Sequence, residues 1–191
     1  MQTRNGVTAE PGRIEVISGG MFSGKSEELV RRLRRAFIAK QRIQVFQPET
    51  DTRTHEEFLI TRDKRQLSAL TVTDSAALRS MLEPDVEVVG IDEAQFFDDG
   101  IVGIAMELAD RGVRVIVAGL DQDYLRVPFG PLPALMSLAE FVDKMHAICV
   151  QCGKAAQYSQ RISGGEQQVL VGDTEAYEAR CRRCYVPYEP E

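Results

Sequence analysis

Residues 19–26 have the residue types and the spacing of a phosphate-binding loop. They match the pattern G-x-x-x-x-G-K-[ST] along their whole length. In this pattern the glycines let backbone N–H groups face an anion, Lys25 can reach the β- and γ-phosphates, and the Ser26 hydroxyl can hold Mg²⁺. An apolar run before the loop and a helical pattern after it argue against a chance match. The segment predicts nucleoside triphosphate binding by Gly19, Gly20, Met21, Phe22, Ser23, Gly24, Lys25 and Ser26.

A pair of carboxylates follows a second apolar run. Asp92 and Glu93 come directly after residues 86–91, which are nearly all apolar. In phosphate-loop enzymes one such carboxylate holds Mg²⁺, and its neighbour handles a proton or orients the nucleophile. Acidic pairs are also common on protein surfaces, but the position after a buried strand favours a catalytic role.

The four cysteines form two C-x-x-C pairs, Cys149/Cys152 and Cys181/Cys184, with 28 residues between the inner two. Four thiolates suit tetrahedral Zn²⁺ and leave no open coordination position, which predicts a structural rather than a catalytic metal. A redox dithiol is the alternative interpretation. Structural zinc contributes on the order of 10 kcal/mol to the folding of such modules. The segment between the pairs is then a long loop that the metal holds at both ends.

Arg53 lies in residues 47–54, a segment without helical or strand periodicity that follows a predicted strand. Its guanidinium could stabilise charge on a phosphoryl group in transfer. An arginine in an exposed loop is more often solvated. Residue type alone therefore leaves both roles open.

Large apolar side chains occur in or beside the same motifs. Such side chains are poor phosphate ligands but good walls for a planar ring, so a nucleobase is a natural ligand. The alternative is that several belong to the core, as we expect for Phe97. The set comprises Met21, Phe22, Phe96, Phe97, Leu120, Tyr124 and Phe129.

The elements that must position these residues alternate between strand and helix. Strands are predicted at residues 14–17, 43–46, 86–91 and 113–120, and helices from residue 25, at 73–82 and at 101–110. Alternation of this kind is typical of parallel βαβ units, which bind ligands at the carboxyl ends of their strands. The predicted fold class is α/β, with a parallel sheet like that of phosphate-loop NTPases and helices on both faces.

The chain is predicted to have three parts. Residues 1–11 are polar and are expected to form a disordered tail. Residues 12–145 carry the alternating pattern of the nucleotide-binding domain. In residues 146–191 paired cysteines, glycines and short strand-like runs predict a small zinc-binding domain.

Composition limits the partners. The net charge of −6 and the pI near 5.1 argue against broad nucleic-acid binding, which needs a surplus of Lys and Arg. Basic residues between positions 31 and 42 are interpreted as the solvated face of an amphipathic helix. No window approaches the roughly 20 apolar residues of a membrane span. We expect a soluble cytoplasmic protein without a nucleic-acid or membrane partner.

Taken together, the motifs resemble one family. Five of them occur in the order and spacing of the zinc-containing thymidine kinases of bacteria and animal cytosol, and the resemblance covers about residues 12–186. The motifs are the phosphate loop, residues 51–53, residues 91–97, residues 118–124 with Pro-Phe-Gly at 128–130, and the cysteine pairs.

The resemblance implies ATP-dependent phosphorylation of thymidine, and of deoxyuridine as well, in nucleotide salvage. It implies that Glu93 is the general base for the 5′-hydroxyl, that Arg53 and Lys25 act at the phosphates, and that Mg²⁺ and structural Zn²⁺ are bound. A homotetramer is also implied. Beyond the phosphate loop, the implied nucleotide-binding residues are Asp51, Thr52, Arg53, Asp92, Glu93, Ala94 and Gln95.

The resemblance further implies that the zinc-held loop closes over the base as a lasso and contacts it largely through backbone groups. The implied substrate residues are Met21, Phe96, Leu120, Tyr124, Phe129, Gln168, Val169, Leu170, Val171, Gly172 and Tyr177. The chain departs from the common family pattern at Gly20, Ala94 and Tyr124, where proline, glycine and phenylalanine are frequent. The extra hydroxyl of Tyr124 puts base preference in question.

Two other functions compete with this one. The run Asp-Glu-Ala-Gln also resembles the acidic box of helicases, which suggests a nucleic-acid-dependent ATPase. The acidic charge and the absence of further helicase motifs argue against it. The second alternative hypothesis is that the cysteine region is an interaction module attached to a nucleotide-dependent switch.

Overall fold

A computed structural model describes residues 11–49, 68–163 and 176–187. It also places the backbone of four two-residue strands, β1 (Thr3–Arg4), β2 (Val7–Thr8), β5 (Phe58–Leu59) and β6 (Gln66–Leu67). β1 pairs with β2 and β5 pairs with β6, both antiparallel. Two predicted site segments, Asp51–Arg53 and Gln168–Gly172, lie outside the described residues, as does most of the predicted tail.

Six parallel strands form the central sheet, in the order β10-β3-β9-β8-β4-β7. Their bounds are β3 (Arg13–Gly19), β4 (Ile43–Pro48), β7 (Leu70–Val72), β8 (Val88–Ile91), β9 (Arg114–Gly119) and β10 (Phe141–Met145). All strands point the same way, so the segments that follow β3, β8 and β9 meet at one edge of the sheet. The predicted parallel α/β fold is confirmed.

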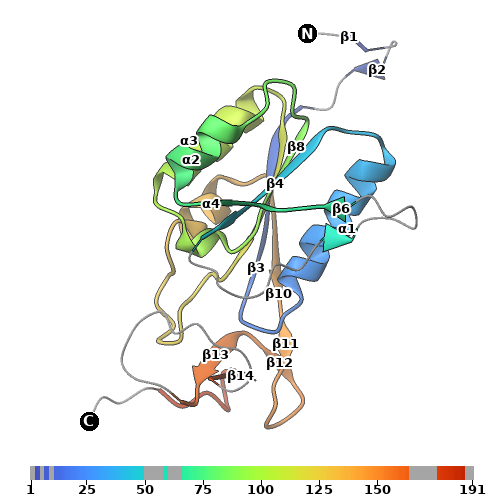
Figure 1. Ribbon diagram of the computed structural model, residues 1–191. Coiled ribbons are helices and arrows are strands. Elements are labelled where there is room, and N and C mark those ends of the chain that lie inside the picture. Colours follow the sequence, from blue (N-terminus) through green and yellow to red (C-terminus); the bar gives the residue numbers. More distant parts are fainter. Residues whose placement is uncertain are drawn as a thin grey trace.

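Helices cover both faces of this sheet (Figure 1). In β9 alternate residues face opposite sides: Val115 and Val117 join one core cluster, and Ile116 and Ala118 join the other. The helix α1 (Lys25–Ile38) packs on the second side through Leu29 and Leu33. The first side is covered by α2 (Ser75–Met81), α3 (Gly100–Asp110) and α4 (Leu132–Leu138). No helix in the described part of the chain is long and apolar enough to cross a membrane.

The local signals located most elements correctly. Asp74, at the predicted start of the short helix, caps α2 by accepting a hydrogen bond from the Ala77 N–H at 2.7 Å. Phe97 is buried in the main core, as expected. Four elements of the central domain were not predicted: β7, α4, β10 and the short 3-10 helix at Ala94–Phe96. β10 has mostly exposed side chains and lies at the sheet edge, so it lacks the apolar run that reveals a buried strand.

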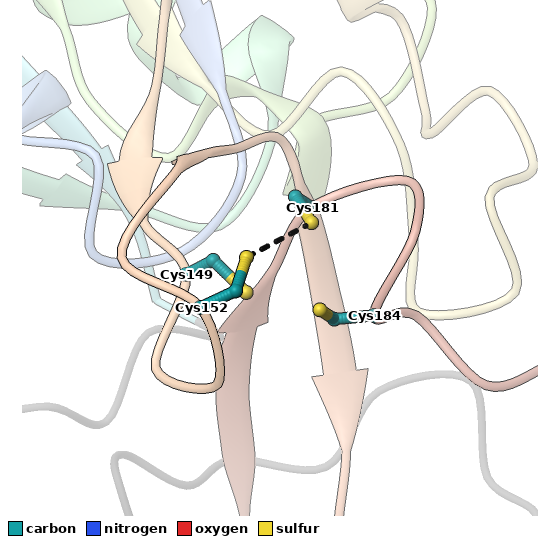
Figure 2. Close-up of side chains that lie close together, drawn as sticks. All are labelled: Cys149, Cys152, Cys181 and Cys184. Carbon is teal, nitrogen blue, oxygen red and sulfur yellow. Dashed lines mark hydrogen bonds between the residues drawn. The ribbon is translucent and has the colours of Figure 1, made fainter.

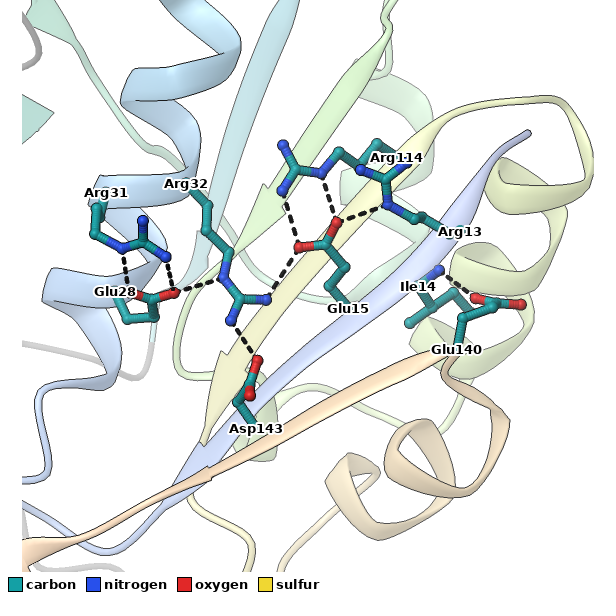
Figure 3. Close-up of polar contacts among 9 residues, drawn as sticks. All are labelled: Arg13, Ile14, Glu15, Glu28, Arg31, Arg32, Arg114, Glu140 and Asp143. Atoms are coloured by element: carbon teal, nitrogen blue, oxygen red, sulfur yellow. Dashed lines mark hydrogen bonds and ion pairs between the residues drawn. The ribbon is translucent and has the colours of Figure 1, made fainter. Parts of the chain in front are cut away.

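One expectation for α1 was only partly right. Its basic residues were interpreted as a solvated face, and the other arginines of the helix are exposed, but Arg32 is buried at 9% exposure. Its guanidinium donates hydrogen bonds to Glu28 at 2.8 Å, Glu15 at 3.0 Å and Asp143 at 2.5 Å (Figure 3). Glu15 lies on β3 beneath this helix, so the arginine is drawn inward by a carboxylate from a distant segment. Periodicity within the helix could not reveal that partner.

Glu15 is the centre of this ion cluster. It accepts hydrogen bonds from Arg114 at 2.6 and 2.9 Å and from Arg13 at 2.8 Å (Figure 3). Burial raises the pKa of this carboxyl group, but the hydrogen bonds and charges of Arg114 and Arg13 outweigh it and hold the pKa at about 2. The carboxylate is therefore ionised whenever the protein is folded near neutral pH.

The cysteine region has a different architecture, two small antiparallel sheets at one end of the molecule (Figure 1). β11 (Ala147–Ile148) pairs with β12 (Ala155–Ala156), and β13 (Tyr158–Arg161) pairs with β14 (Tyr177–Arg180). Its buried cluster consists of small side chains, Ala147, Cys149, Ala156, Ala179 and Cys181. This cluster contains few apolar atoms, so a bound metal ion would add substantially to its stability.

Candidate active site and metal centre

The phosphate loop connects the end of β3 to the start of α1. Gly19 has φ 150°, and a Cβ atom there would lie 2.5 Å from the Met145 carbonyl oxygen, so only glycine fits. Phe22 adopts φ 63°, a strained conformation for a non-glycine residue, and Gly24 follows with φ 81°. These left-handed residues turn the backbone into a concave loop whose N–H groups can surround an anion. The N-terminal end of α1 adds its positive dipole.

Lys25, the first residue of α1, is buried and reaches back over the loop. Its Nζ donates a hydrogen bond to the Gly20 carbonyl oxygen at 2.8 Å, and Ser23 Oγ donates to the same oxygen at 2.8 Å. The ammonium group is thus positioned at the loop itself rather than in solvent. This is the location at which a lysine can meet bound phosphates.

The acidic pair follows β8 at the same sheet edge. Asp92 is buried, and its Oδ1 accepts a hydrogen bond from the Glu93 N–H at 2.9 Å. Burial and the neighbouring Glu93 charge raise the pKa of Asp92 to about 6, partly offset by the Glu93 N–H, Ser26 and Lys25. A serine hydroxyl and an aspartate carboxylate are oxygen ligands of the kind that Mg²⁺ takes. Ser26 and Asp92 could therefore hold that ion together.

Glu93 is held in place by its own backbone and by Gln95. It has φ 47°, and its Oε2 accepts a hydrogen bond from Gln95 Nε2 at 2.5 Å. Gln95 is 2% exposed, and its Oε1 accepts a hydrogen bond from the Leu120 N–H at 2.9 Å, just after β9. The glutamine therefore anchors the carboxylate to a neighbouring strand end. Ala94, expected among the nucleotide-binding residues, has its side chain in the main core.

The aromatic residues form two groups. Tyr124 and Tyr177 are buried together with Ala176, and Met21 of the phosphate loop packs against them. Phe96 and Phe129 make an edge-to-face pair with ring centroids 5.6 Å apart. Three residues of the predicted substrate set thus come together: Met21, Tyr124 and, from β14, Tyr177. The first group brings the phosphate loop and the cysteine region into contact.

Three residues that connect the cysteine region to the rest were not found from the sequence. Ser159 Oγ accepts a hydrogen bond from the Met21 N–H at 3.0 Å. The Tyr185 hydroxyl donates to the Tyr124 carbonyl oxygen at 2.7 Å. Arg161 is buried against Tyr124 and Tyr177. Their only sequence signal is position, since Ser159 and Arg161 lie in a short strand between the cysteine pairs and Tyr185 directly follows Cys184.

The four cysteine side chains converge, as the sequence predicted (Figure 2). All four Sγ atoms lie within 4.8 Å of one another, and Cys152 Sγ and Cys181 Sγ are 3.6 Å apart. Tetrahedral zinc with Zn–S bonds of about 2.3 Å places its sulfur ligands about 3.8 Å apart. The cluster therefore fits a structural zinc ion with all four coordination positions filled by protein.

The ionisation of the cluster also favours a cation. Burial raises the pKa of the Cys149 thiol, but hydrogen bonds from the backbone N–H groups of Cys181, Gln151 and Cys152 bring it down to about 6. Hydrogen bonding with Cys152 instead raises the pKa of Cys184 to about 12. Four thiolates cannot share this space without compensating positive charge, and bound zinc would supply that charge.

Comparisons with known proteins agree with one another. The family model described as thymidine kinase matches residues 12–185. The chain is 51% identical to the thymidine kinase of Bacteroides fragilis, covering 93% of this chain and 89% of that one. It is 52% identical to the Porphyromonas gingivalis thymidine kinase, covering 91% and 85%, and 51% identical to that of a Rhodothermus species, covering 94% and 84%. Domain III of the Thermotoga maritima replication initiation protein DnaA has a TM-score of only 0.44, too low to bear on the function.

Proposed function

The chain belongs to the thymidine kinase family, and from that premise we propose that it transfers the γ-phosphoryl group of ATP to the 5′-hydroxyl of thymidine. The observation that carries the proposal is the position of the phosphate loop and the acidic pair at one edge of the sheet, where Ser26 and Lys25 both act to lower the pKa of Asp92. With this arrangement a triphosphate, a metal ion and a proton acceptor can meet in one place.

In this mechanism the chain's own residues position the reactants and move one proton. Lys25 neutralises charge on the β- and γ-phosphates, and Arg53 acts there too. Ser26 and Asp92 hold Mg²⁺, which supplies positive charge to the phosphate oxygens when bound. Glu93, oriented by Gln95, accepts the proton of the 5′-hydroxyl. At the same time the 5′-oxygen of the nucleoside attacks the γ-phosphorus, and the bond from that phosphorus to the β–γ bridging oxygen breaks, which releases ADP.

The acceptor nucleoside binds on the side of the cysteine region. Met21, Tyr124 and Tyr177 form the apolar walls for the base. The pocket is completed by Leu120, Phe96 and Phe129. Residues Gln168–Gly172 form the lasso that closes over the base and contacts it through backbone groups. Structural zinc at the four cysteines holds both ends of this lasso.

We further propose that residues 12–145 form the kinase domain and residues 146–191 the zinc-binding and lasso domain. The enzyme acts in the cytoplasm as a homotetramer in nucleotide salvage, and it accepts deoxyuridine as well as thymidine. Its net charge of −6 supports the absence of a nucleic-acid partner.

A nucleoside panel tests the proposed function. The purified protein is given ATP, Mg²⁺ and one nucleoside at a time, and the monophosphate formed is identified. We expect thymidine 5′-monophosphate, with deoxyuridine also converted. In Glu93→Gln, turnover should fall by about 100-fold or more because the proton acceptor is lost. ATP hydrolysis that needs DNA or RNA and gives no thymidine product would instead support the helicase-like alternative.

A further inference from the structure

Arg161 is a buried residue whose contacts have no role in the reaction described above. It is the last residue of β13 and is 8% exposed. Its guanidinium carbon lies 3.7 Å from the centroid of the Tyr124 ring, and its Nη2 donates a hydrogen bond to the Tyr177 hydroxyl at 2.6 Å. A single buried side chain thus contacts both tyrosines of the predicted base pocket.

The two tyrosines come from different parts of the molecule. Tyr177 lies directly opposite Arg161 in the β13–β14 pair, so their side chains belong to one small sheet. Tyr124 belongs to the loop after β9 of the central sheet, and its carbonyl oxygen is held by the Tyr185 hydroxyl. Arg161 therefore connects a ring of the kinase domain to a ring of the cysteine region.

The distance to Tyr124 has a steric consequence. A guanidinium carbon 3.7 Å from a ring centroid is in stacking contact with one face of the ring, so a planar base can stack on Tyr124 only from the opposite face. The hydrogen bond to Tyr177 uses Nη2 of the same guanidinium, so one planar group makes both contacts. Lysine would keep the charge but could not make both contacts, because it lacks the planar guanidinium.

We propose that Arg161 is a positioning residue for the nucleoside, fixing the two tyrosine rings so that one planar base fits beside them. This inference rests on the proposed function, because it assigns Tyr124 and Tyr177 to the base. Arg161 does not act on the reacting phosphoryl group, since its contacts are to the aromatic walls. Its loss should therefore weaken nucleoside binding more than turnover.

Steady-state kinetics of the full-length protein tests this role, with wild type, Arg161→Met, Arg161→Lys and Tyr177→Phe compared. We expect the KM for thymidine to rise about 10-fold in Arg161→Met and about 3-fold in Tyr177→Phe, which loses only the hydrogen bond. Arg161→Lys should lie between these two. The kcat and the KM for ATP should stay within about twofold of wild type, because the phosphate loop is untouched.

Arg35→Met is the matched control. This arginine is exposed in the last turn of α1, nine residues beyond Ser26 at the end of the phosphate loop, so its loss should leave both KM values unchanged. An unchanged thymidine KM in both Arg161→Met and Tyr177→Phe would overturn the inference. So would a parallel loss of kcat, ATP binding and bound zinc in Tyr177→Phe, which would indicate a purely structural role. If wild type itself fails to phosphorylate thymidine, the proposed function fails instead.

Discussion

The phosphate-loop region and the cysteine region are stabilised in different ways. The loop lies between β3 and α1, and both elements bury large aliphatic side chains such as Ile17, Leu29 and Leu33. The cysteine region buries three alanines and two cysteines in its own cluster. The first region obtains its rigidity from the hydrophobic core, whereas the four clustered cysteines of the second are compatible with stabilisation by a structural zinc ion.

The boundary between these regions is made of a few specific contacts. The backbone of Met21 binds Ser159, and the backbone of Tyr124 binds Tyr185. A Cβ atom on Gly20 would lie 3.0 Å from the Gln157 carbonyl oxygen, which explains why a residue without a side chain suits this position of the loop. The comparison suggests that donor binding and acceptor binding can be damaged separately.

The largest expected effect is on the donor side. Lys25→Ala removes the ammonium group at the phosphate loop. We expect turnover to fall by about 100- to 1,000-fold, because the negative charge on the β- and γ-phosphates is no longer neutralised during transfer. Zinc content and calorimetric thymidine affinity should remain within about twofold of wild type, since Lys25 belongs to α1 and not to the cysteine region. A simultaneous loss of bound zinc would show that the two regions do not fold independently.

Removal of zinc should damage the acceptor side. Structural zinc contributes on the order of 10 kcal/mol to folding of such a module, so its removal should disorder the base pocket and weaken thymidine binding by roughly 10- to 100-fold. Affinity for a non-hydrolysable ATP analogue should change by less than about threefold, because the central sheet is intact. Both are measured by calorimetry after treatment with a zinc-selective chelator.

Restoring zinc is the control for that experiment. Added Zn²⁺ should recover the thymidine affinity, and added Mg²⁺ should not, because four sulfur ligands favour zinc over a cation that prefers oxygen. Unchanged thymidine affinity after verified zinc loss would contradict the proposed role of the metal.

A smaller effect on stability is expected at acid pH, and the two regions should lose stability at different pH values. Glu15 has a pKa of about 2 in the folded protein and an ordinary value of 4.5, so its stabilising contribution is complete above pH 4.5 and is lost as the pH falls toward 2. Glu15→Gln should lower the free energy of unfolding near neutral pH by roughly 1–3 kcal/mol and flatten its change across this interval. Acid denaturation followed by circular dichroism measures both.

The matched control for Glu15 is Glu83→Gln, an exposed glutamate for which we expect no change in stability. Zinc content is followed in the same titration. The cysteine thiols must be deprotonated to bind the metal, so as the pH falls zinc should be released before Glu15 is protonated. Loss of the central sheet in step with zinc release would contradict the separation of the two regions.

The sequence alone determined the features that short-range patterns encode. The phosphate loop, the acidic pair and the cysteine pairs are contiguous motifs, and the alternation of strands and helices indicates a parallel sheet. Because parallel strands share one carboxyl edge, the convergence of the phosphate loop and the acidic pair at one edge of the sheet also followed from the order of elements.

The tertiary structure decided which polar side chains are buried and what they contact. Arg32 was interpreted as solvated, yet it binds Glu15 and Asp143, residues 17 and 111 positions away. No sequence pattern singled out Arg161, and none indicated that Gln95 connects Glu93 to the backbone at the end of β9. Helical and strand periodicity depends on neighbours a few residues apart, whereas the partner of a buried charge is set by the packing of distant segments.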